Sequence, residues 1–392
     1  MKSRERRVTV LGSTGSVGVN TIELIELHNA LQPGRFRVVA LTANQNVELL
    51  IQQARRLLPE FVAIAQESKY DQLKRELSGS GVEVAAGEAA VVEAALRSSD
   101  WLMASIMGAA GLRPTLAAVS RGITVALANK ECLVTAGALF MKEVKRTKTT
   151  LLPVDSEHNA VFQVFDTAQP GSIDGVILTA SGGPFRTWST QQMASATPAQ
   201  ACKHPNYKMG AKISVDSATL MNKGLELIEA HHLFGTAPER LSVLIHPQQA
   251  VHCLVTYIDG SVLAQLASPD MRTPIAYSLG YPERIIAPTK RLNLLELGQL
   301  SFEAADTLKF PCLDLAQKAM KTGGSVPTVL NAANEVAVDA FLAGKLAFQG
   351  ISSVVSRAID TCEIPLEAPS SIEDALALDT LAREHAKRAL QN

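Results

Sequence analysis

The sequence is poor in cysteine and has no long apolar run, and each absence excludes a class of protein. Its five cysteines are scattered, odd in number and never spaced as CxxC, which argues against a disulfide framework and a cysteine zinc site. No segment reaches the roughly 18 apolar residues of a membrane span, and the basic start lacks an apolar signal core. We therefore expect a cytoplasmic protein with no membrane partner.

A strong charge imbalance is also lacking. The net charge is −1, from 37 basic and 38 acidic residues, which argues against a general nucleic-acid binder. What the chain does have is length and apolar content: 392 residues, of which 47% are hydrophobic. Such a chain forms two or three domains with large cores.

Residues 1–150 alternate strand-like and helix-like segments. The strand candidates are continuous apolar runs, which is typical of strands covered on both faces. The repeated strand–helix–strand order predicts a Rossmann-like, doubly wound parallel sheet. The expected strands cover residues 8–12, 37–43, 61–65, 82–86, 100–106 and 123–129.

The pattern of predicted secondary structure changes after residue 150 and again after residue 285. Residues 151–285 predict an α+β catalytic domain, with a hairpin turning at Asp259-Gly260 and a helix over 218–234. Residues 286–304 are irregular and predict a linker, and residues 305–392 predict a small helical bundle.

The first expected strand runs directly into GSTGSVG, residues 12–18. Glycines at Gly12, Gly15 and Gly18 permit a tight turn and let a pyrophosphate approach the N-terminus of the next helix. The pattern alone is weak, but its place between a strand and an amphipathic helix indicates dinucleotide binding.

The tip of the second strand bears on the choice of dinucleotide. NAD sites usually carry a carboxylate there, which bonds the ribose 2′-hydroxyl. Here the tip carries three neutral polar residues, Asn44, Gln45 and Asn46, which leave room for a 2′-phosphate. We therefore expect NADPH.

The stretch LLPVDSEHNAVF, residues 151–162, ends an apolar run in two carboxylates and an imidazole. One interpretation is a solvated turn in which Asp155 or Ser156 caps a helix. The other is a metal site built from Asp155 and Glu157, with His158 outside the ligand set or without a role.

A second polar cluster lies in KISVDSATLMNKGLELIEAHHLF, residues 212–234. Ser217, Asn222 and Lys223 are phosphate-binding residue types. Glu226 shares a helix face with Lys223, either as a surface ion pair or as a third carboxylate for one ion. Three carboxylates without cysteine suit Mg²⁺ or Mn²⁺, with Co²⁺ as a further candidate.

Three further features leave alternatives open. SGGPF, residues 181–185, is either a plain tight turn or a turn that presents Ser181 to an anion. KHPNYKMG, residues 203–210, reads as a loop, in which His204 is either a lid residue or an ordinary surface histidine. His231 and His232 are explained by surface positions near a helix end.

Taken in order, these motifs resemble one family, the 1-deoxy-D-xylulose 5-phosphate reductoisomerases. The likeness runs nearly end to end, and the succession of motifs is far more specific than any one of them. The matching stretches are GSTGSVG (12–18), ANKE (128–131), VDSEHNA (154–160), SGGPFR (181–186), HPNYKMGAKISVDSATLMNKGLE (204–226), IHPQ (245–248), SPDMRTPIA (268–276) and LNAANEVAV (330–338).

The resemblance implies an NADPH domain, a catalytic domain and a helical bundle, assembled as a homodimer. It implies that Asp155, Glu157 and Glu226 bind the metal and are catalytic together with Lys130. It also implies a sugar-phosphate substrate, 1-deoxy-D-xylulose 5-phosphate. The implied substrate contacts are Lys130, Ser156, Glu157, Ser181, His204, Ser217, Asn222, Lys223 and Glu226.

The resemblance also implies the cofactor contacts, which are Gly12, Ser13, Thr14, Gly15, Ser16, Val17, Asn44, Gln45, Asn46, Asn129, Glu131, Gly210 and Met271. The sequence departs from the family at the second strand tip, where a lysine is usual and Gln45 stands. It departs again at Tyr207, where the family usually has tryptophan.

The implied reaction rearranges the substrate's carbon skeleton, by retro-aldol cleavage and re-addition or by a direct alkyl shift, and reduces the resulting aldehyde to 2-C-methyl-D-erythritol 4-phosphate. This is a step of the non-mevalonate route to isoprenoid precursors. Two other classes stay open: another NADP-dependent oxidoreductase, which would not need a metal, and a nucleotide-sensing protein without turnover.

Overall fold

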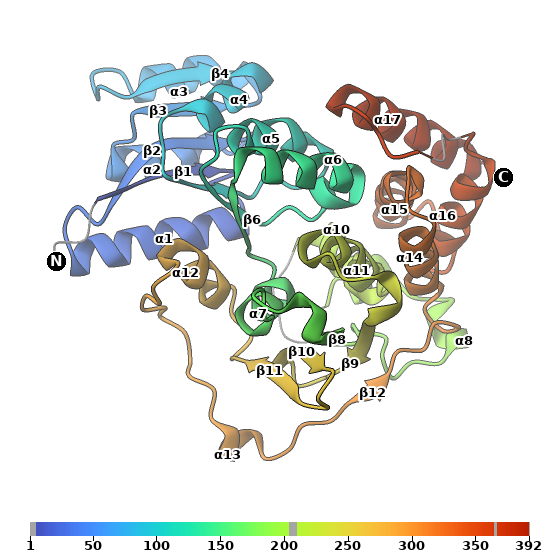
Figure 1. The fold of residues 1–392 in the computed structure, drawn as a ribbon. Helices are drawn as coiled ribbons and strands as arrows, with labels where there is room; N and C mark the ends of the chain where they lie inside the picture. Colours follow the sequence, from blue (N-terminus) through green and yellow to red (C-terminus); the bar gives the residue numbers. More distant parts are fainter. Residues whose placement is uncertain (1–4, 204–209, 364–366, 392) are drawn as a thin grey trace. The chain divides into compact units, whose positions relative to one another are not determined.

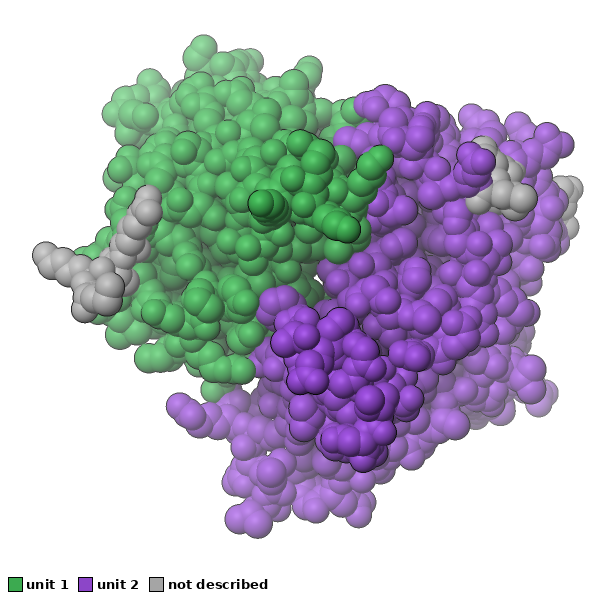
Figure 2. Space-filling view, viewed as in Figure 1, with its two compact units in different colours: residues 1–132, 140–159, 271–289 green, residues 133–139, 160–270, 290–392 purple. Residues whose placement is uncertain are grey.

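The computed structural model describes residues 5–203, 210–363 and 367–391. The chain divides into two compact units (Figure 2). Unit 1 comprises residues 1–132, 140–159 and 271–289, and unit 2 comprises residues 133–139, 160–270 and 290–392. Within the described residues, every helix is too short or too polar to cross a bilayer.

Unit 1 contains the predicted doubly wound sheet, and this prediction is confirmed. Seven strands, all parallel, lie in the order β4-β3-β2-β1-β5-β6-β7. Strands such as β3 and β5 are buried along their whole length, as their continuous apolar sequences predict. The strands are β1 (Arg6–Leu11), β2 (Phe36–Ala43), β3 (Phe61–Ile64), β4 (Glu83–Ala86), β5 (Trp101–Ala104), β6 (Thr124–Leu127) and β7 (Thr150–Pro153).

The helices of unit 1 cover both faces of this sheet (Figure 1). Helices α4 and α5 pack against each other, α2 packs against α3, and α12 packs against α1. The helices are α1 (Ser16–Leu31), α2 (Val47–Leu57), α3 (Tyr70–Glu76), α4 (Glu88–Leu96), α5 (Leu112–Val119) and α12 (Arg272–Gly280). Two more, α6 (Glu131–Thr147) and α7 (Ser156–Val164), have residues in both units.

Unit 2 is built on a mixed five-stranded sheet in the order β11-β10-β8-β9-β12. The predicted hairpin is confirmed: β10 and β11 pair in antiparallel fashion, and Gly260 has φ +86° in the turn. The strands are β8 (Ile173–Ala180), β9 (Leu241–Ile245), β10 (Val251–Tyr257), β11 (Val262–Leu266) and β12 (Glu303–Ala304).

The helices of unit 2 share one apolar core with this sheet. Helix α11 packs on β8, β9 and α14, and Gly224 permits the close approach to Ala316 of α14. The helices are α8 (Thr190–Met193), α9 (Pro198–Ala201), α10 (Ala211–Ala218), α11 (Met221–Phe234), α13 (Leu294–Leu297), α14 (Pro311–Thr322), α15 (Val326–Leu342), α16 (Gly350–Thr361) and α17 (Ile372–Ala389).

The helix predicted over 218–234 begins later than expected, so that part of the prediction is wrong. Leu220 has φ +59°, a left-handed conformation that ends α10 and turns the chain into α11. The hydroxyl of Thr219 donates to the carbonyl of Asp216 and accepts from the N–H of Met221, which holds the corner.

The predicted domain boundaries remain a prediction.

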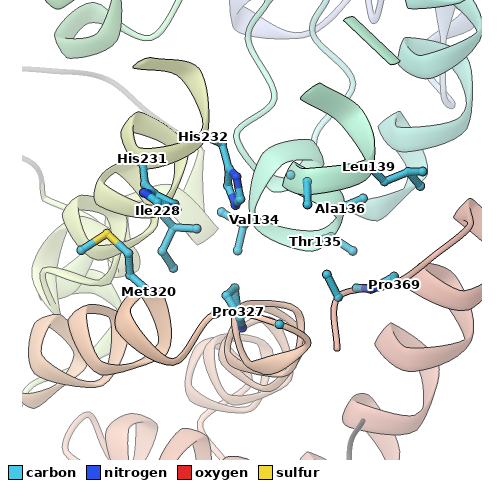
Figure 3. A pocket seen from close by; sticks show the side chains of 15 residues that line it. Val134, Thr135, Ala136, Leu139, Ile228, His231, His232, Met320, Pro327 and Pro369 are labelled. Carbon is cyan, nitrogen blue, oxygen red and sulfur yellow. The ribbon is translucent and has the colours of Figure 1, made fainter. Parts of the chain in front are cut away.

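A small cavity of unit 2 lies where α6 is interrupted (Figure 3). Ala136 leaves the helical conformation, with φ −141° and ψ 30°. A Cβ at Gly137 would lie 2.2 Å from Cδ2 of His232, so glycine lets the imidazole pack against this segment. His231 and His232 both line the cavity, which corrects the expectation that they lie simply on the surface.

Burial, with the neighbouring His231, lowers the pKa of His232 to about 4. Between pH 6.5 and 4 the unfolded chain therefore binds a proton at this site that the native chain does not bind. We predict that the native state loses up to about 3 kcal/mol from this residue as the pH falls through that range. His232→Gln should remove this part of the pH dependence, measured by urea unfolding.

His385→Gln, on α17 outside the cavity, is the matched control and should keep the wild-type dependence. A His232→Gln curve parallel to wild type from pH 7 to 4 would contradict the prediction.

Candidate functional site

The predicted glycine loop joins β1 to α1 in unit 1. Gly12 has φ +78°, and a Cβ at Gly18 would lie 2.2 Å from the carbonyl oxygen of Gly12, so strand and helix meet through glycine alone. Gly15 is the N-cap of α1 and offers no side-chain cap, and both Gly15 and Ser16 are exposed. Exposed N–H groups at a helix start fit a pyrophosphate.

Ser13 is buried, unlike the exposed Gly15 and Ser16 of the same loop. Its hydroxyl is buried and lies 2.7 Å from Oε1 of Gln53, and its N–H donates to the carbonyl of Thr42. These bonds tie the loop to β2 and α2. The cofactor contact predicted for Ser13 remains a prediction.

The tip of β2 is exposed and carries no carboxylate, as the sequence predicts. Asn44, Gln45 and Asn46 are all exposed. Asn46 also caps α2, because its side chain accepts the N–H of Leu49 at 3.2 Å. The tip therefore fits a 2′-phosphate by the absence of a negative charge.

The loop after β5 carries no sequence signal for cofactor binding. The strand order reverses between β1 and β5, and ligands of open α/β sheets bind at such a switch point. Asn129 holds this loop by donating to the carbonyl oxygens of Ile106 and Gly108 at 2.5 and 3.1 Å. Met107 is exposed there and is a further candidate for cofactor contact.

The remaining predicted cofactor residues lie in different surroundings. Glu131 is buried at the start of α6, and Met271 packs against the core of unit 1 at the start of α12. Gly210 is the exposed N-cap of α10 in unit 2. His204 lies outside the described residues.

Lys130, Asp155 and His158 form a polar group of unit 1 at the carboxyl ends of β6 and β7. Nζ of Lys130 lies 2.6 Å from Oδ2 of Asp155, and Nδ1 of His158 lies 3.7 Å from Oδ1. Burial alone would raise the pKa of Asp155, but the Lys130 ammonium and His158 hold it well below its usual value. Asp155 is therefore an anion at neutral pH.

Ser156 and Glu157 open α7 directly beside this pair. The hydroxyl of Ser156 donates to Oε2 of Glu157 at 2.6 Å, and Glu157 is buried. The carbonyl of Asp155 accepts the N–H of Asn159, so Asp155 also stands at the helix start. Of the interpretation as a solvated helix-capping turn, the helix start is confirmed and the solvation is wrong, because Glu157 is buried and the Asp155 side chain is 17% exposed. The metal site remains a prediction.

In unit 2 the SGGPF turn packs against the end of α10. Gly183 has φ +68°, and a Cβ there would lie 2.7 Å from the carbonyl oxygen of Ser217. The N–H of Gly183 donates to the hydroxyl of Ser181 at 3.1 Å. The turn is tight, as the simpler interpretation holds, and it joins the segments of Ser181 and Ser217.

Asn222, Lys223 and Glu226 form a polar group of unit 2 at the start of α11. Lys223 and Asn222 both donate to the carboxylate of Glu226. The side chains of Lys223 and Glu226 are only 5% and 2% exposed, so the interpretation as a surface ion pair is wrong. Buried pairs of this kind are costly to desolvate and are common where charge serves binding.

The side chains of these polar groups are of the chemical types that bind the predicted divalent cation and phosphate. Asp155, Glu157 and Glu226 are oxygen donors of the kind that Mg²⁺ and Mn²⁺ prefer, and no described cysteine lies among them. Lysine ammonium groups pair with Asp155 and Glu226, so a positive charge stands beside each carboxylate. Hydroxyl, amide and ammonium donors on the α10–α11 corner suit a phosphate.

Comparison with known proteins gives the family. A family model described as 1-deoxy-D-xylulose 5-phosphate reductoisomerase matches residues 8–137, and two models of C-terminal domains of that enzyme match residues 151–234 and 266–385. The enzyme of that name from Rhodospirillum centenum is 58% identical over 97% of this chain and 93% of its own length. The one from Zymomonas mobilis is 51% identical over 100% and 99%.

Solved structures agree with the sequence relatives. The Zymomonas mobilis enzyme in complex with NADPH superposes with a TM-score of 0.94, at 50% identity, over 99% of this chain and 100% of that one. A reductoisomerase in complex with NADPH, fosmidomycin and magnesium gives 0.93 at 40% identity, over 98% of each chain. The chain belongs to the 1-deoxy-D-xylulose 5-phosphate reductoisomerase family.

Proposed function

We propose that this chain converts 1-deoxy-D-xylulose 5-phosphate to 2-C-methyl-D-erythritol 4-phosphate with NADPH and a divalent cation, for isoprenoid precursor synthesis. The observation that carries the proposal is the Lys130–Asp155 pair, which stands at the same edge of the parallel sheet as the glycine loop. Relatives bound to NADPH and magnesium support it. We place the enzyme in the cytoplasm, because none of its five cysteines, which all lie in described segments, forms a disulfide; cell fractionation tests this.

Bound NADPH supplies the hydride that reduces the rearranged aldehyde. The loop Gly12–Val17 holds the pyrophosphate at the start of α1, and Asn44, Gln45 and Asn46 receive the 2′-phosphate. Asn129, Glu131, Gly210 and Met271 complete the cofactor contacts. Asn129 acts in addition through the β5 loop that it holds.

A divalent cation polarises the ketone and makes the neighbouring hydroxyl more acidic when it is bound. Its proposed ligands are Asp155, Glu157 and Glu226. The chain prepares them for this role, since the pKa of Asp155 stays low and Glu226 is held as an ion pair. Lys130 and Ser156 contact the substrate's carbon chain, and the bond from Ser156 to Glu157 fixes the hydroxyl there.

The phosphate of the substrate binds to Ser181, Ser217, Asn222 and Lys223, with His204 nearby. All except His204 lie in described segments of unit 2. Binding energy from this non-reacting group orients the reacting carbons. Lys223, which pairs with Glu226 in this structure, would share its ammonium group with the bound phosphate, and Glu226 would be a ligand of the cation.

The first test is NADPH oxidation, followed by absorbance, with the pure protein and 1-deoxy-D-xylulose 5-phosphate. We predict oxidation that needs both the sugar phosphate and Mg²⁺ or Mn²⁺, that stops with a chelator and that returns when the ion is restored. Oxidation that continues in excess chelator would favour a metal-independent oxidoreductase. NADPH binding without any oxidation would favour the nucleotide-sensing alternative.

We also propose that two copies of the chain associate through β11. Among the described residues this strand pairs only with β10, and its outer edge is open. Its sequence, VLAQL, carries no charge, and Val262 and Leu263 are exposed. An uncharged apolar edge is a template for antiparallel pairing, and a second copy pairs with it in a two-fold arrangement.

Leu263→Lys places a charge on this edge and should convert the dimer to a monomer in light scattering at micromolar concentration. Leu31→Lys changes an equally exposed leucine at the end of α1 and serves as the control. A Leu263→Lys protein with the wild-type mass would contradict the proposed interface.

A further inference from the structure

The segment LNAANEVAV has no role in the chemistry above, although it belongs to the family's succession of motifs. It forms part of α15, which packs against α10. Asn334 is fully buried there, and its Nδ2 donates to Oδ1 of Asp216 at 2.7 Å. Its Oδ1 has no hydrogen-bond partner within the described part of the chain.

Asp216 is a buried carboxylate at the meeting point of three helices. It is 1% exposed, and its Oδ2 lies 3.0 Å from Nζ of Lys212, one turn earlier on α10. The thiol of Cys312, on α14, is close enough to Asp216 to be affected by its charge. Burial and the charge of Asp216 together raise the pKa of Cys312 to about 12. Asn334 is thus the neutral donor that anchors this charge from a second helix.

The anchored residue directly precedes Ser217, which ends α10 beside the SGGPF turn. Gly183 packs against the Ser217 carbonyl, and Leu220 turns the chain left-handed toward Asn222 and Lys223. A rotation of α10 would therefore move Ser217 and shift the whole corner. The bond from α15 opposes such a rotation at the point nearest to the phosphate ligands.

The half-satisfied amide of Asn334 argues that stability is not its purpose. A buried carbonyl oxygen without a partner carries a desolvation cost, which leucine would avoid. Asn331 carries the same cost, because its Oδ1 also lacks a partner among the described residues, so the feature that distinguishes Asn334 is the bond that it donates to Asp216.

We propose that Asn334 and Asp216 are positioning residues, whose hydrogen bond holds α10 so that Ser217 faces the substrate phosphate. This inference rests on the proposed function, because it takes Ser217 as a phosphate ligand. It adds α15, a helix without any predicted ligand, to the determinants of substrate affinity.

The experiment compares Asn334→Leu with Asn331→Leu. Asn331 lies one turn earlier on α15, is equally buried and donates to Glu335 instead of Asp216. We measure KM for 1-deoxy-D-xylulose 5-phosphate, inhibition by inorganic phosphate, and the Kd for NADPH. Asn334→Leu should raise KM and the phosphate inhibition constant by about tenfold, the scale of one lost bond to a charged group.

The Kd for NADPH should stay within about twofold of wild type in both variants, and Asn331→Leu should leave all three constants within that range. If Asn334→Leu is unfolded by circular dichroism, Asp216→Asn takes its place. That variant keeps an acceptor of the same shape without the charge, so we expect a smaller rise, about threefold, in the same two constants.

Equal effects of the two leucine variants, or a parallel loss of NADPH affinity, would overturn the inference, as would an unchanged KM in a folded Asn334→Leu protein. Wild-type turnover is measured first. Failure of the proposed function therefore shows as an inactive wild type, whereas failure of this inference shows as a wild-type-like variant of an active enzyme.

Discussion

Ion pairs between lysine and carboxylate are the interaction on which the proposed chemistry depends. Asp155 and Glu226 are carboxylates in poorly hydrated surroundings, and each is paired with an ammonium group, Lys130 in unit 1 and Lys223 in unit 2. Without Lys130 and His158, burial would raise the pKa of Asp155. The two ion pairs place carboxylates and ammonium groups where a divalent cation and a phosphate are expected to bind.

The backbone supplies the positions that these charges require. Parallel strands bring the glycine loop, Lys130 and Asp155 to one edge of one sheet, although they are far apart in the sequence. In unit 2, a glycine at 183 and a left-handed Leu220 let two turns and two helix ends meet closely. Glycine adopts a positive φ freely, whereas the left-handed conformation of Leu220 persists because the surrounding core enforces it.

Much of this follows from sequence patterns, and most of the exceptions share a cause. The strands of unit 1, the glycine loop and the shared face of Lys223 and Glu226 depend on contacts within a few residues, so periodicity and spacing predict them. The inward bonds of Ser13 and the bond from Asn334 to Asp216 depend on partners from other segments. The start of α11 was missed for a different reason, because a leucine gives no sequence signal for the left-handed conformation of Leu220. Asn334 and Asp216 are 118 residues apart, a separation that no local pattern encodes.

The most direct test of the central claim is Mn²⁺ binding, followed by the loss of the free-ion signal in electron paramagnetic resonance. The account predicts that Asp155→Asn, Glu157→Gln and Glu226→Gln each weaken Mn²⁺ binding by at least about tenfold and leave NADPH binding intact. Asp379→Asn, which changes a buried carboxylate of α17 that pairs with Arg383, should bind Mn²⁺ as wild type does. Wild-type Mn²⁺ affinity in Glu226→Gln would contradict the account.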